Sequence, residues 1–516
     1  MASKGKARII EISIISIGEG LSHIGCKNCY LLKVEYEFED GTTYTVGFCL
    51  DCGQEIPEWD EDENRSVLDW EHVPDFEIIE DEVDHLEAIV ISHAHRDHDG
   101  AINKLVEHAM KSDKWGDLLP EIIMPPYGAR MQQAREYKDL TAEPPRLERE
   151  YTVASHPKFK IFNDFIEEYE DGETWVFRIE DGFWYNADDV EILESDVVFH
   201  FFKVNHSVAD SFAILIEAGG KSIIYSGDLR FHGANQSETV DFVQRIADPR
   251  LQNVDLLMLD ATGADKQGTG KPEEVAIQNF LDLADRHPSQ RIIGTMFSSQ
   301  PKILEFLRTF GRRGDERQVV VHGGSMQDNL KWGHQYWPLS DDADFNPGSW
   351  RRYSYGRGPE VADNAIIFAT GSQGEPLSAL SRLLDDEYNE EMEDIYLTSD
   401  DIVVFAARTI PGNEQPVTNI LKKLRDIGCT IYYPLDHDGN APQWAREAGG
   451  ENMAFEELHI SGHAPRDDLQ EIVDRLNPKK LMPIHAPLSH RALMADMMEN
   501  PEDVLLPADK EEIVIL

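Results

Sequence analysis

The chain has 516 residues, which is long for one domain, so we expect two domains or one domain with a large insertion. Its hydrophobic content of 41% is ample for a sizeable core and excludes a wholly disordered chain. The formal net charge of −49 is extreme and has two interpretations. Either the surface is acidic for solubility in a salt-rich cytoplasm, or it repels polyanions and disfavours a nucleic-acid substrate. Charge alone does not decide between them.

Five cysteines in so long a chain indicate a reducing compartment rather than a disulfide framework. The N-terminal stretch Met1–Gly18 is interrupted by Glu11, and no small-residue cleavage site follows, so a signal peptide is not expected. No uninterrupted apolar segment reaches the length of a membrane span. The sequence therefore predicts a soluble, cytoplasmic protein.

Four of the cysteines form two Cys-x-x-Cys pairs, Cys26/Cys29 and Cys49/Cys52, with a spacing near that of a zinc ribbon. Both pairs lie in or beside apolar segments, where strand alternation would point the members of a pair in different directions. Free cysteine is also a common core residue. We therefore favour core thiols over a structural zinc site.

The first elements, in residues 8–52, are predicted strands separated by glycine-containing turns: Ile9–Ile17, Cys29–Tyr36 and Tyr44–Leu50. The last of them leads into Asp51-Cys52-Gly53. An aspartate at the end of a buried strand is a candidate for orienting a metal-bound water, and an ordinary turn-forming aspartate is an equal alternative.

The stretch Ile91–Gly100 concentrates metal-ligand side chains: His93, His95, Asp97 and His98 fall within six residues. An apolar β-type segment precedes it and an amphipathic helical pattern follows it, which places the cluster on a strand-to-helix loop. Imidazole and carboxylate together suit zinc or a similar divalent ion, and so dense a set can serve two ions. This pattern predicts a metal site rather than a solvated polar loop.

Later strands also end in histidine or aspartate. Residues 115–195 are weakly periodic and are expected to be insertions around a core. Beyond them, the predicted strands Val197–Val204, Ser222–Tyr225 and Val254–Leu259 lead to His206, Asp228 and Asp260 respectively. Side chains at the ends of several strands of one sandwich can come together to form a single site.

From about residue 266 the pattern changes to alternating helices and buried strands, which predicts an inserted domain with a parallel sheet. Its glycine-rich turns carry Ser325 and Ser372, and Ser461 lies on another such turn. Turn amides and hydroxyls of this kind can bind anions, although each could also be an ordinary turn. The C-terminal part then supplies His463 and, after a strand, His485.

Together these motifs resemble the metallo-β-lactamase fold with an inserted β-CASP domain, and within that group ribonuclease J. The resemblance rests on the following stretches: His93-x-His95-x-Asp97-His98, Asn205–Ser211, Gly371-Ser372-Gln373-Gly374-Glu375-Pro376, Ile410-Pro411-Gly412-Asn413-Glu414 and Ser461-Gly462-His463. It covers most of the chain except roughly 115–195 and 333–360. It implies an α/β fold: an αββα sandwich formed by 1–265 and 436–516, with an atypical insertion at about 115–195 and a β-CASP parallel-sheet domain at 266–435.

The resemblance also implies roles for the site residues. One metal would be held by His93, His95 and His206, the second by Asp97, His98 and His485, and Asp228 would bridge both. Asp51 would steady the bridging hydroxide, and Asp260 and His463 match extra acidic and histidine motifs, with His463 placed to donate to a phosphate or leaving oxygen. The loops of Ser325, Ser372 and Ser461, with His463, would contact RNA phosphate.

The implied function is a metal-dependent ribonuclease that uses a hydroxide activated by two metals, with 5′→3′ exonuclease action on 5′-monophosphate RNA and endonuclease activity as an addition. We expect two Zn²⁺ per chain, with Mn²⁺ as the alternative, RNA as the partner and no membrane association. A homodimer stays open, but not one formed through a C-terminal domain, because the chain stops where the core ends.

Two other functions are kept as alternatives: a metallohydrolase of a small phosphodiester or ester, and a catalytically inactive RNA-binding scaffold. The sequence also departs from the family pattern. Asp260-Ala261-Thr262-Gly263 stands where Asp-Ser-Thr-Asn is usual, and His485-Ala486-Pro487 stands where His-Gly-Glu is usual. These departures bear on fine positioning rather than on metal binding.

Overall fold

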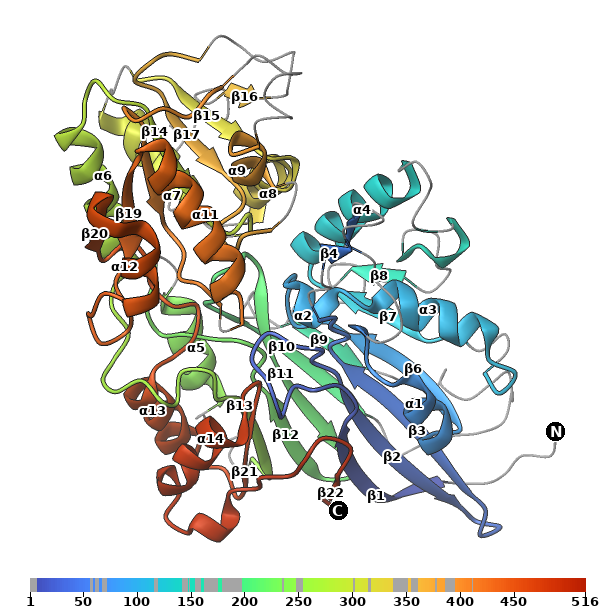
Figure 1. Ribbon diagram of the computed structural model, residues 1–516. Coiled ribbons are helices and arrows are strands. Elements are labelled where there is room, and N and C mark those ends of the chain that lie inside the picture. The colour runs from blue at the N-terminus through green and yellow to red at the C-terminus, as the bar shows by residue number, and fades with distance from the viewer. Residues whose placement is uncertain are drawn as a thin grey trace. The chain divides into compact units, whose positions relative to one another are not determined.

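The computed structural model in Figure 1 divides the chain into two compact units. Unit 1 comprises Met1–Phe231, Asn235–Gly270 and Gly462–Leu516, and unit 2 comprises His232–Ala234 and Lys271–Ser461. The structure describes residues 7–55, 59–60, 65–66, 72–115, 119–141, 147, 149–153, 159–161, 175–178, 197–233, 236–246, 254–299, 302–313, 317–336, 351–353, 361–375, 378–385, 395–410 and 412–516.

Unit 1 contains two large mixed sheets. The first has the order β22-β1-β2-β3-β6-β7-β8, with strands β1 (Ala7–Ser16), β2 (Tyr30–Phe38), β3 (Thr43–Leu50), β6 (His85–Val90), β7 (Glu121–Met124), β8 (Phe159–Ile161) and β22 (Glu512–Val514). The second has the order β21-β13-β12-β11-β10-β9, with strands β9 (Trp175–Arg178), β10 (Val198–Val204), β11 (Ser211–Ala218), β12 (Lys221–Tyr225), β13 (Leu256–Asp260) and β21 (Leu481–Ile484). A small hairpin pairs β4 (Trp59–Asp60) with β5 (Arg65–Ser66).

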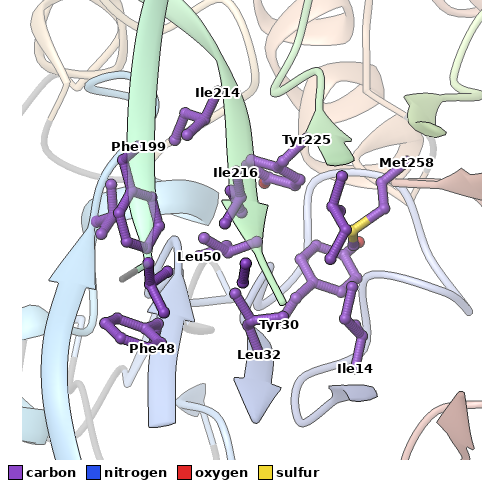
Figure 2. Close-up of a cluster of buried hydrophobic side chains, with 14 of the residues drawn as sticks. Ile14, Tyr30, Leu32, Phe48, Leu50, Phe199, Ile214, Ile216, Tyr225 and Met258 are labelled. Carbon is purple, nitrogen blue, oxygen red and sulfur yellow. The ribbon is translucent and has the colours of Figure 1, made fainter. Parts of the chain in front are cut away.

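The two sheets of unit 1 face each other across a shared apolar core. Period-2 alternation sends one face of each strand inward, so Leu32 and Phe48 of the first sheet pack with Phe199 and Ile214 of the second (Figure 2). The rings of Phe48 and Phe199 lie 5.3 Å apart. Burial of this kind, worth about 25 cal/mol per Å² of apolar surface, is what holds the layers together.

Helices cover the outer faces of both sheets, which completes the predicted αββα sandwich. The helices of unit 1 are α1 (Phe76–Glu82), α2 (Arg96–Asp99), α3 (Ile102–Lys111), α4 (Pro126–Thr141), α5 (Gln236–Ile246), α13 (Arg466–Leu476) and α14 (Leu488–Arg491), with 3-10 turns η2 (Arg149–Tyr151), η6 (Ala492–Met497) and η7 (Pro501–Asp503). Apolar stripes of α1 and α3 pack on the first sheet, and those of α5 and α13 pack on the second.

Unit 2 is built on one sheet of seven parallel strands in the order β16-β15-β17-β14-β18-β19-β20. In chain order its elements are α6 (Glu273–Arg286), β14 (Ile292–Thr295), α7 (Lys302–Arg313), β15 (Val319–His322), α8 (Gly324–Tyr336), β16 (Arg351–Tyr353), β17 (Ile366–Ala369), α9 (Ala379–Leu383), β18 (Ile402–Phe405), α11 (Glu414–Ile427), β19 (Thr430–Pro434), α12 (Gln443–Gly449), η5 (Gly450–Asn452) and β20 (Met453–Glu456). Continuous apolar strands are expected here because a parallel sheet is buried on both faces. The predicted parallel-sheet domain is thus present.

Two boundaries differ from the sequence-based expectation. The return to the sandwich was predicted at residue 436, whereas the chain stays in unit 2 up to Ser461, because β20 pairs with β19 and extends the parallel sheet. The start of unit 2 moves from 266 to Lys271. The first shift arises because strand pairing, which sequence periodicity does not report, decides which sheet a segment joins. The second arises because Lys266, Gly268 and Gly270 are hydrogen-bonded to the first turn of α13 in unit 1.

The segment 115–195 also contains more regular structure than its weak periodicity indicated. β7 pairs with β6 inside the first sheet, and α4 is a helix of 16 residues. Much of the remaining insertion lies outside the described residues. The described part of the chain contains no helix that is long and apolar enough to cross a membrane.

The cysteines are free thiols. Cys29, Cys49 and Cys52 are fully buried within the apolar cluster on the outer face of the first sheet. None of the potential metal-ligand groups found among the described residues contains a cysteine. These positions agree with the preference for core thiols.

Candidate metal centre

Strand ends of both sheets in unit 1 deliver the predicted ligands to one place. The His93–His98 cluster follows β6, and its second half forms the short helix α2. His206 follows β10, Asp228 follows β12 and His485 follows β21. Because β12, β13 and β21 are parallel neighbours, their carboxyl ends lie at the same edge of the second sheet.

The first set of side chains consists of three imidazoles and one carboxylate, whose donor atoms surround a single point. His95 Nδ1 lies 3.2 Å from His93 Nε2 and 3.1 Å from His206 Nε2. Asp228 Oδ2 lies 3.6 Å from His93 Nε2 and 3.4 Å from His206 Nε2. A tetrahedral zinc ion with bonds of about 2.0–2.1 Å has ligand–ligand edges of about 3.3 Å. The donor atoms therefore fit a tetrahedral cation.

The second set lies next to the first. Asp97 Oδ2 is 3.1 Å from His485 Nε2 and 3.6 Å from His98 Nε2. His98 Nε2 is also 3.4 Å from Asp228 Oδ1. These two imidazoles and two carboxylates again have the donor types and the spacing of a divalent-ion site.

Asp228 connects the two sets through its two carboxylate oxygens. Oδ2 faces His93 and His206, whereas Oδ1 faces His98. Oδ1 is buried and accepts no hydrogen bond within the described residues. A buried carboxylate oxygen costs free energy unless it is paired, and a cation on each side would satisfy both oxygens. The site thus fits a metal centre on its own geometry.

Four of the imidazoles are held from outside through Nδ1, which leaves Nε2 facing the centre. The Nδ1 contacts are His93 to Ser92 Oγ at 2.9 Å, His98 to Asp51 Oδ2 at 2.6 Å, His206 to the Gly462 carbonyl at 2.7 Å and His485 to Thr262 Oγ1 at 2.7 Å. Such outer contacts fix the tautomer and ring orientation of a metal-ligating histidine.

Asp51 is the main anchor outside the two sets. Its carboxylate accepts hydrogen bonds from Ser92 N at 2.6 Å, Ser92 Oγ at 2.8 Å, Tyr225 Oη at 2.6 Å and His98 Nδ1. It also has a positive φ of 59°, which is uncommon for a residue with a side chain. These contacts make Asp51 a positioning residue for His98. That it steadies a hydroxide stays a prediction.

Burial and carboxylates set the protonation of the imidazoles. Burial lowers the pKa of His95 to about 4 and those of His93 and His206 well below the ordinary value. These three rings are therefore neutral at pH 7, which is the form that binds a metal.

In the second set, the carboxylates affect the pKa values of the imidazoles more strongly than burial does. Burial alone would lower the pKa of His98, but the nearby carboxylates, Asp228 first, outweigh it and hold the pKa well above the ordinary value. The same balance raises the pKa of His485 to about 10. Asp97, which is partly buried, and Asp228, which is buried, have lowered pKa values because the imidazoles favour their charged forms and outweigh the effect of burial. Without a cation, the rings of His98 and His485 would therefore be protonated at pH 7, and a bound cation would take the place of their protons.

His463 and Asp260 form a pair beside the two sets. His463 Nδ1 donates to Asp260 Oδ2 at 2.7 Å, and its ring stacks on His485 with centroids 5.4 Å apart. Asp260 is fully buried, whereas the His463 side chain is 19% exposed. The pair therefore holds one imidazole with its orientation fixed and part of its surface open to a substrate.

The three serines predicted to contact phosphate lie in unit 2. Ser325 is exposed in the first turn of α8, and Ser372 is buried between Gly371 and Gln373. Ser461 is the last residue of unit 2, and its carbonyl accepts a hydrogen bond from His232 Nε2 at 2.8 Å. Their phosphate contacts stay a prediction.

Sequence reasoning missed Tyr225, Ser92 and the hydroxyl of Thr262 as parts of the site. Ser92 directly precedes His93, so its place in the motif was a usable signal. Tyr225 lies 174 residues from Asp51, and Thr262 lies 223 residues from His485. Neither pair has a local sequence pattern.

Comparisons with known proteins agree with this architecture. A family model described as Ribonuclease J, beta-CASP domain, matches residues 289–424. A second, described as Zn-dependent metallo-hydrolase RNA specificity domain, matches residues 452–507. The solved structure of a protein of unknown function from Enterococcus faecalis V583 covers 98% of this chain and is itself covered in full, with a TM-score of 0.54 and 17% identity, which shows a shared fold.

Curated relatives extend the similarity over most of the chain. Ribonuclease J of Mycobacterium tuberculosis is 28% identical over 476 residues, which are 89% of this chain and 68% of the relative. Ribonuclease J of Mycoplasma genitalium is 26% identical over 475 residues, 90% of this chain and 66% of the relative. Ribonuclease J of Helicobacter pylori is 24% identical over 428 residues, 81% of this chain and 50% of the relative.

The sandwich, its histidine-rich edge and the matched β-CASP sheet define a metallo-β-lactamase-fold hydrolase. Within that class the chain is a ribonuclease J-like β-CASP nuclease.

Proposed function

We propose that this ribonuclease uses two cations, zinc by first choice and manganese as the alternative, to hydrolyse RNA from a 5′-monophosphate end in the 5′→3′ direction. The proposal rests mainly on Asp228, because its two carboxylate oxygens face two different sets of imidazoles. A single-cation site would require only one of these sets. The similarity to ribonuclease J supplies the substrate class.

In this proposal the ligands fall into two groups that share Asp228. The first cation would be held by His93, His95 and His206, and the second by Asp97, His98 and His485. When bound, the two cations would supply Lewis-acid charge at the scissile phosphate and would lower the pKa of an attacking water.

The outer side chains would keep the donors in place during turnover. Asp51 holds His98, and Ser92 connects Asp51 to His93 through its hydroxyl. Because these contacts are made inside a buried site, they cost no reorganisation when a substrate arrives. Their role in the reaction is to keep each Nε2 directed at the centre.

His463 would act on the substrate itself. With Nδ1 donating to Asp260, its other nitrogen is available to donate to a non-bridging phosphate oxygen or to the leaving 3′ oxygen. The partial exposure of this side chain supports such a role. Asp260 would stabilise the protonated imidazole.

The serine loops of unit 2 would bind phosphate groups of the RNA. Gly371 and Gly374 on either side of Ser372 have φ values of 119° and 80°, which directs successive amides in a way that an anion can use. Ser325 lies at the start of α8, where helix amides favour negative charge. Phosphate binding at these loops would supply the preference for a 5′-monophosphate.

The proposed setting is the cytoplasm, which the free thiols support. A chain with a net charge of −49 repels RNA, which is also a polyanion, unless salt ions screen that repulsion. Molar salt has a Debye length of about 3 Å and would screen that repulsion.

The test is digestion of three RNAs with the same sequence: 5′-monophosphate, 5′-triphosphate and internally labelled 5′-monophosphate. Each is incubated with the zinc-loaded protein at low and at molar salt. We expect mononucleotides released progressively from the 5′-monophosphate end, slower decay of the triphosphate, and faster reaction at molar salt. Internal fragments as the first products would contradict the exonuclease direction. Turnover of a small phosphodiester with no RNA cleavage would instead favour a small-molecule hydrolase.

A further inference from the structure

Helix α4 contacts the loop that carries most of the candidate ligands through Arg135. Arg135 Nη1 donates to both carboxylate oxygens of Asp99, each at 2.6 Å, and Nη2 donates to the Ala94 carbonyl at 2.9 Å. Ala94 stands between His93 and His95, and Asp99 directly follows His98. One guanidinium therefore joins the beginning and the end of the ligand cluster.

The contact is charge-assisted and largely shielded from water. Asp99 is fully buried, and the Arg135 side chain is 20% exposed. An arginine that reaches a carboxylate and a carbonyl at once restricts geometry more strongly than a single hydrogen bond, because its donors form a rigid plane. The Asp99 carboxylate belongs to none of the candidate ligand groups, and its side-chain hydrogen-bond partner is Arg135.

Helix α4 is itself fixed at several points. At its start, Tyr127 N donates to Asp210 Oδ2 at 3.2 Å, and Asp210 lies four residues after His206. Farther along, Glu136 Oε1 accepts from Asn103 Nδ2 of α3 at 2.8 Å. The helix therefore contacts two ligand-bearing loops and is braced against α3, so Arg135 projects from a rigid element.

We propose that Arg135 is a positioning residue of the metal centre: through Asp99 and the Ala94 carbonyl it keeps His93, His95 and His98 at metal-binding spacing. This inference rests on the proposed metal centre and not on the identity of the substrate. Its measurable consequence is slower loss of the bound cation.

The test measures the release of zinc from the zinc-loaded full chain to an excess of a chromogenic chelator, well below the melting temperature. We expect Arg135→Gln to accelerate zinc release about 10–100-fold, the range typical of residues that support metal ligands from outside. Arg135→Lys should recover part of the loss, because one ammonium can reach Asp99 but cannot serve both acceptors. Asp99→Asn, which preserves shape, should release zinc about tenfold faster.

Unit 2 offers a matched control. Arg291 donates to Asp401 at 2.8 and 2.7 Å and also to the Tyr396 carbonyl, so it makes the same kind of forked contact. Arg291→Gln should lower the melting temperature as Arg135→Gln does, but should leave zinc release unchanged. Equal rates of zinc release from Arg135→Gln and Arg291→Gln would overturn the proposal. Equal rates from Asp99→Asn and the wild type would also overturn it. A wild type that holds zinc but does not cleave RNA would contradict the proposed function and leave this inference standing.

Discussion

The metal centre of unit 1 and the serine loops of unit 2 are both polar sites at strand ends, but they are constructed differently. At the metal centre, imidazoles such as His98 and His206 are held through one nitrogen while the other faces the centre. In the serine loops the hydroxyls carry little of the support: Ser325 is exposed, and Ser372 Oγ accepts a long contact of 3.5 Å from Gln373 Nε2. Cation binding needs fixed side chains, whereas anion binding in a turn can use backbone amides. Substitutions should therefore act far more strongly in the first region.

The largest effect is expected for Asp228→Asn. This variant removes the charge that both ligand sets share, so both cations should bind weakly and RNA cleavage should fall by about a thousandfold or more. Elemental analysis of the purified variant, together with a cleavage assay, measures both quantities. Asp255→Asn, in an ion pair at the other end of the same sheet, serves as the control and should retain metal and activity. Normal metal content in Asp228→Asn would remove the basis for a shared carboxylate.

His463→Ala should separate binding from chemistry. Because His463 contacts Asp260 rather than completing either of the two ligand sets, we expect metal content near that of the wild type. RNA cleavage should fall about 10²–10³-fold, the usual cost of removing one donor to a developing charge. Undiminished decay of labelled RNA by this variant would refute the role proposed for the imidazole.

Tyr225→Phe should have an intermediate effect. The variant removes one donor to Asp51 and loosens the support of His98, so metal affinity should fall about 10–100-fold. Tyr433→Phe is the matched control, because it removes a buried hydroxyl that contacts Thr409 in unit 2. Both variants should lose about 1 kcal/mol of unfolding free energy. Only Tyr225→Phe should weaken metal binding in a chelator competition; equal affinities would contradict the positioning role.

The smallest effect is expected for Ser372→Ala. If its hydroxyl contributes one hydrogen bond to a 5′-phosphate, the preference for 5′-monophosphate over 5′-hydroxyl RNA should fall about fivefold, which corresponds to about 1 kcal/mol. Ser399→Ala, at an exposed serine of unit 2, should leave the preference unchanged. A thousandfold loss in Ser372→Ala would show that the serine loop depends on its side chain as strongly as the metal centre does.

The sequence revealed those parts of the fold and site that local patterns encode. The cluster His93–His98 was recognisable because its members fall within one loop, and period-2 alternation revealed the sandwich strands. Two residues that support the ligands, Tyr225 and Thr262, were not recognisable, because they act on partners far away in the chain. The end of unit 2 was missed for a similar reason, since only the pairing of β20 with β19 assigns that segment to the parallel sheet.

In the proposed metal centre, side chains from separate strand ends meet around two cations that share Asp228. Anomalous scattering from crystals of the zinc-loaded protein, recorded on both sides of the zinc absorption edge, tests it most directly. We expect two peaks in unit 1, one among His93, His95 and His206 and the other beside His98 and His485, with Asp228 between them. A single peak, or a peak at the buried cysteines with none beside Asp228, would contradict it.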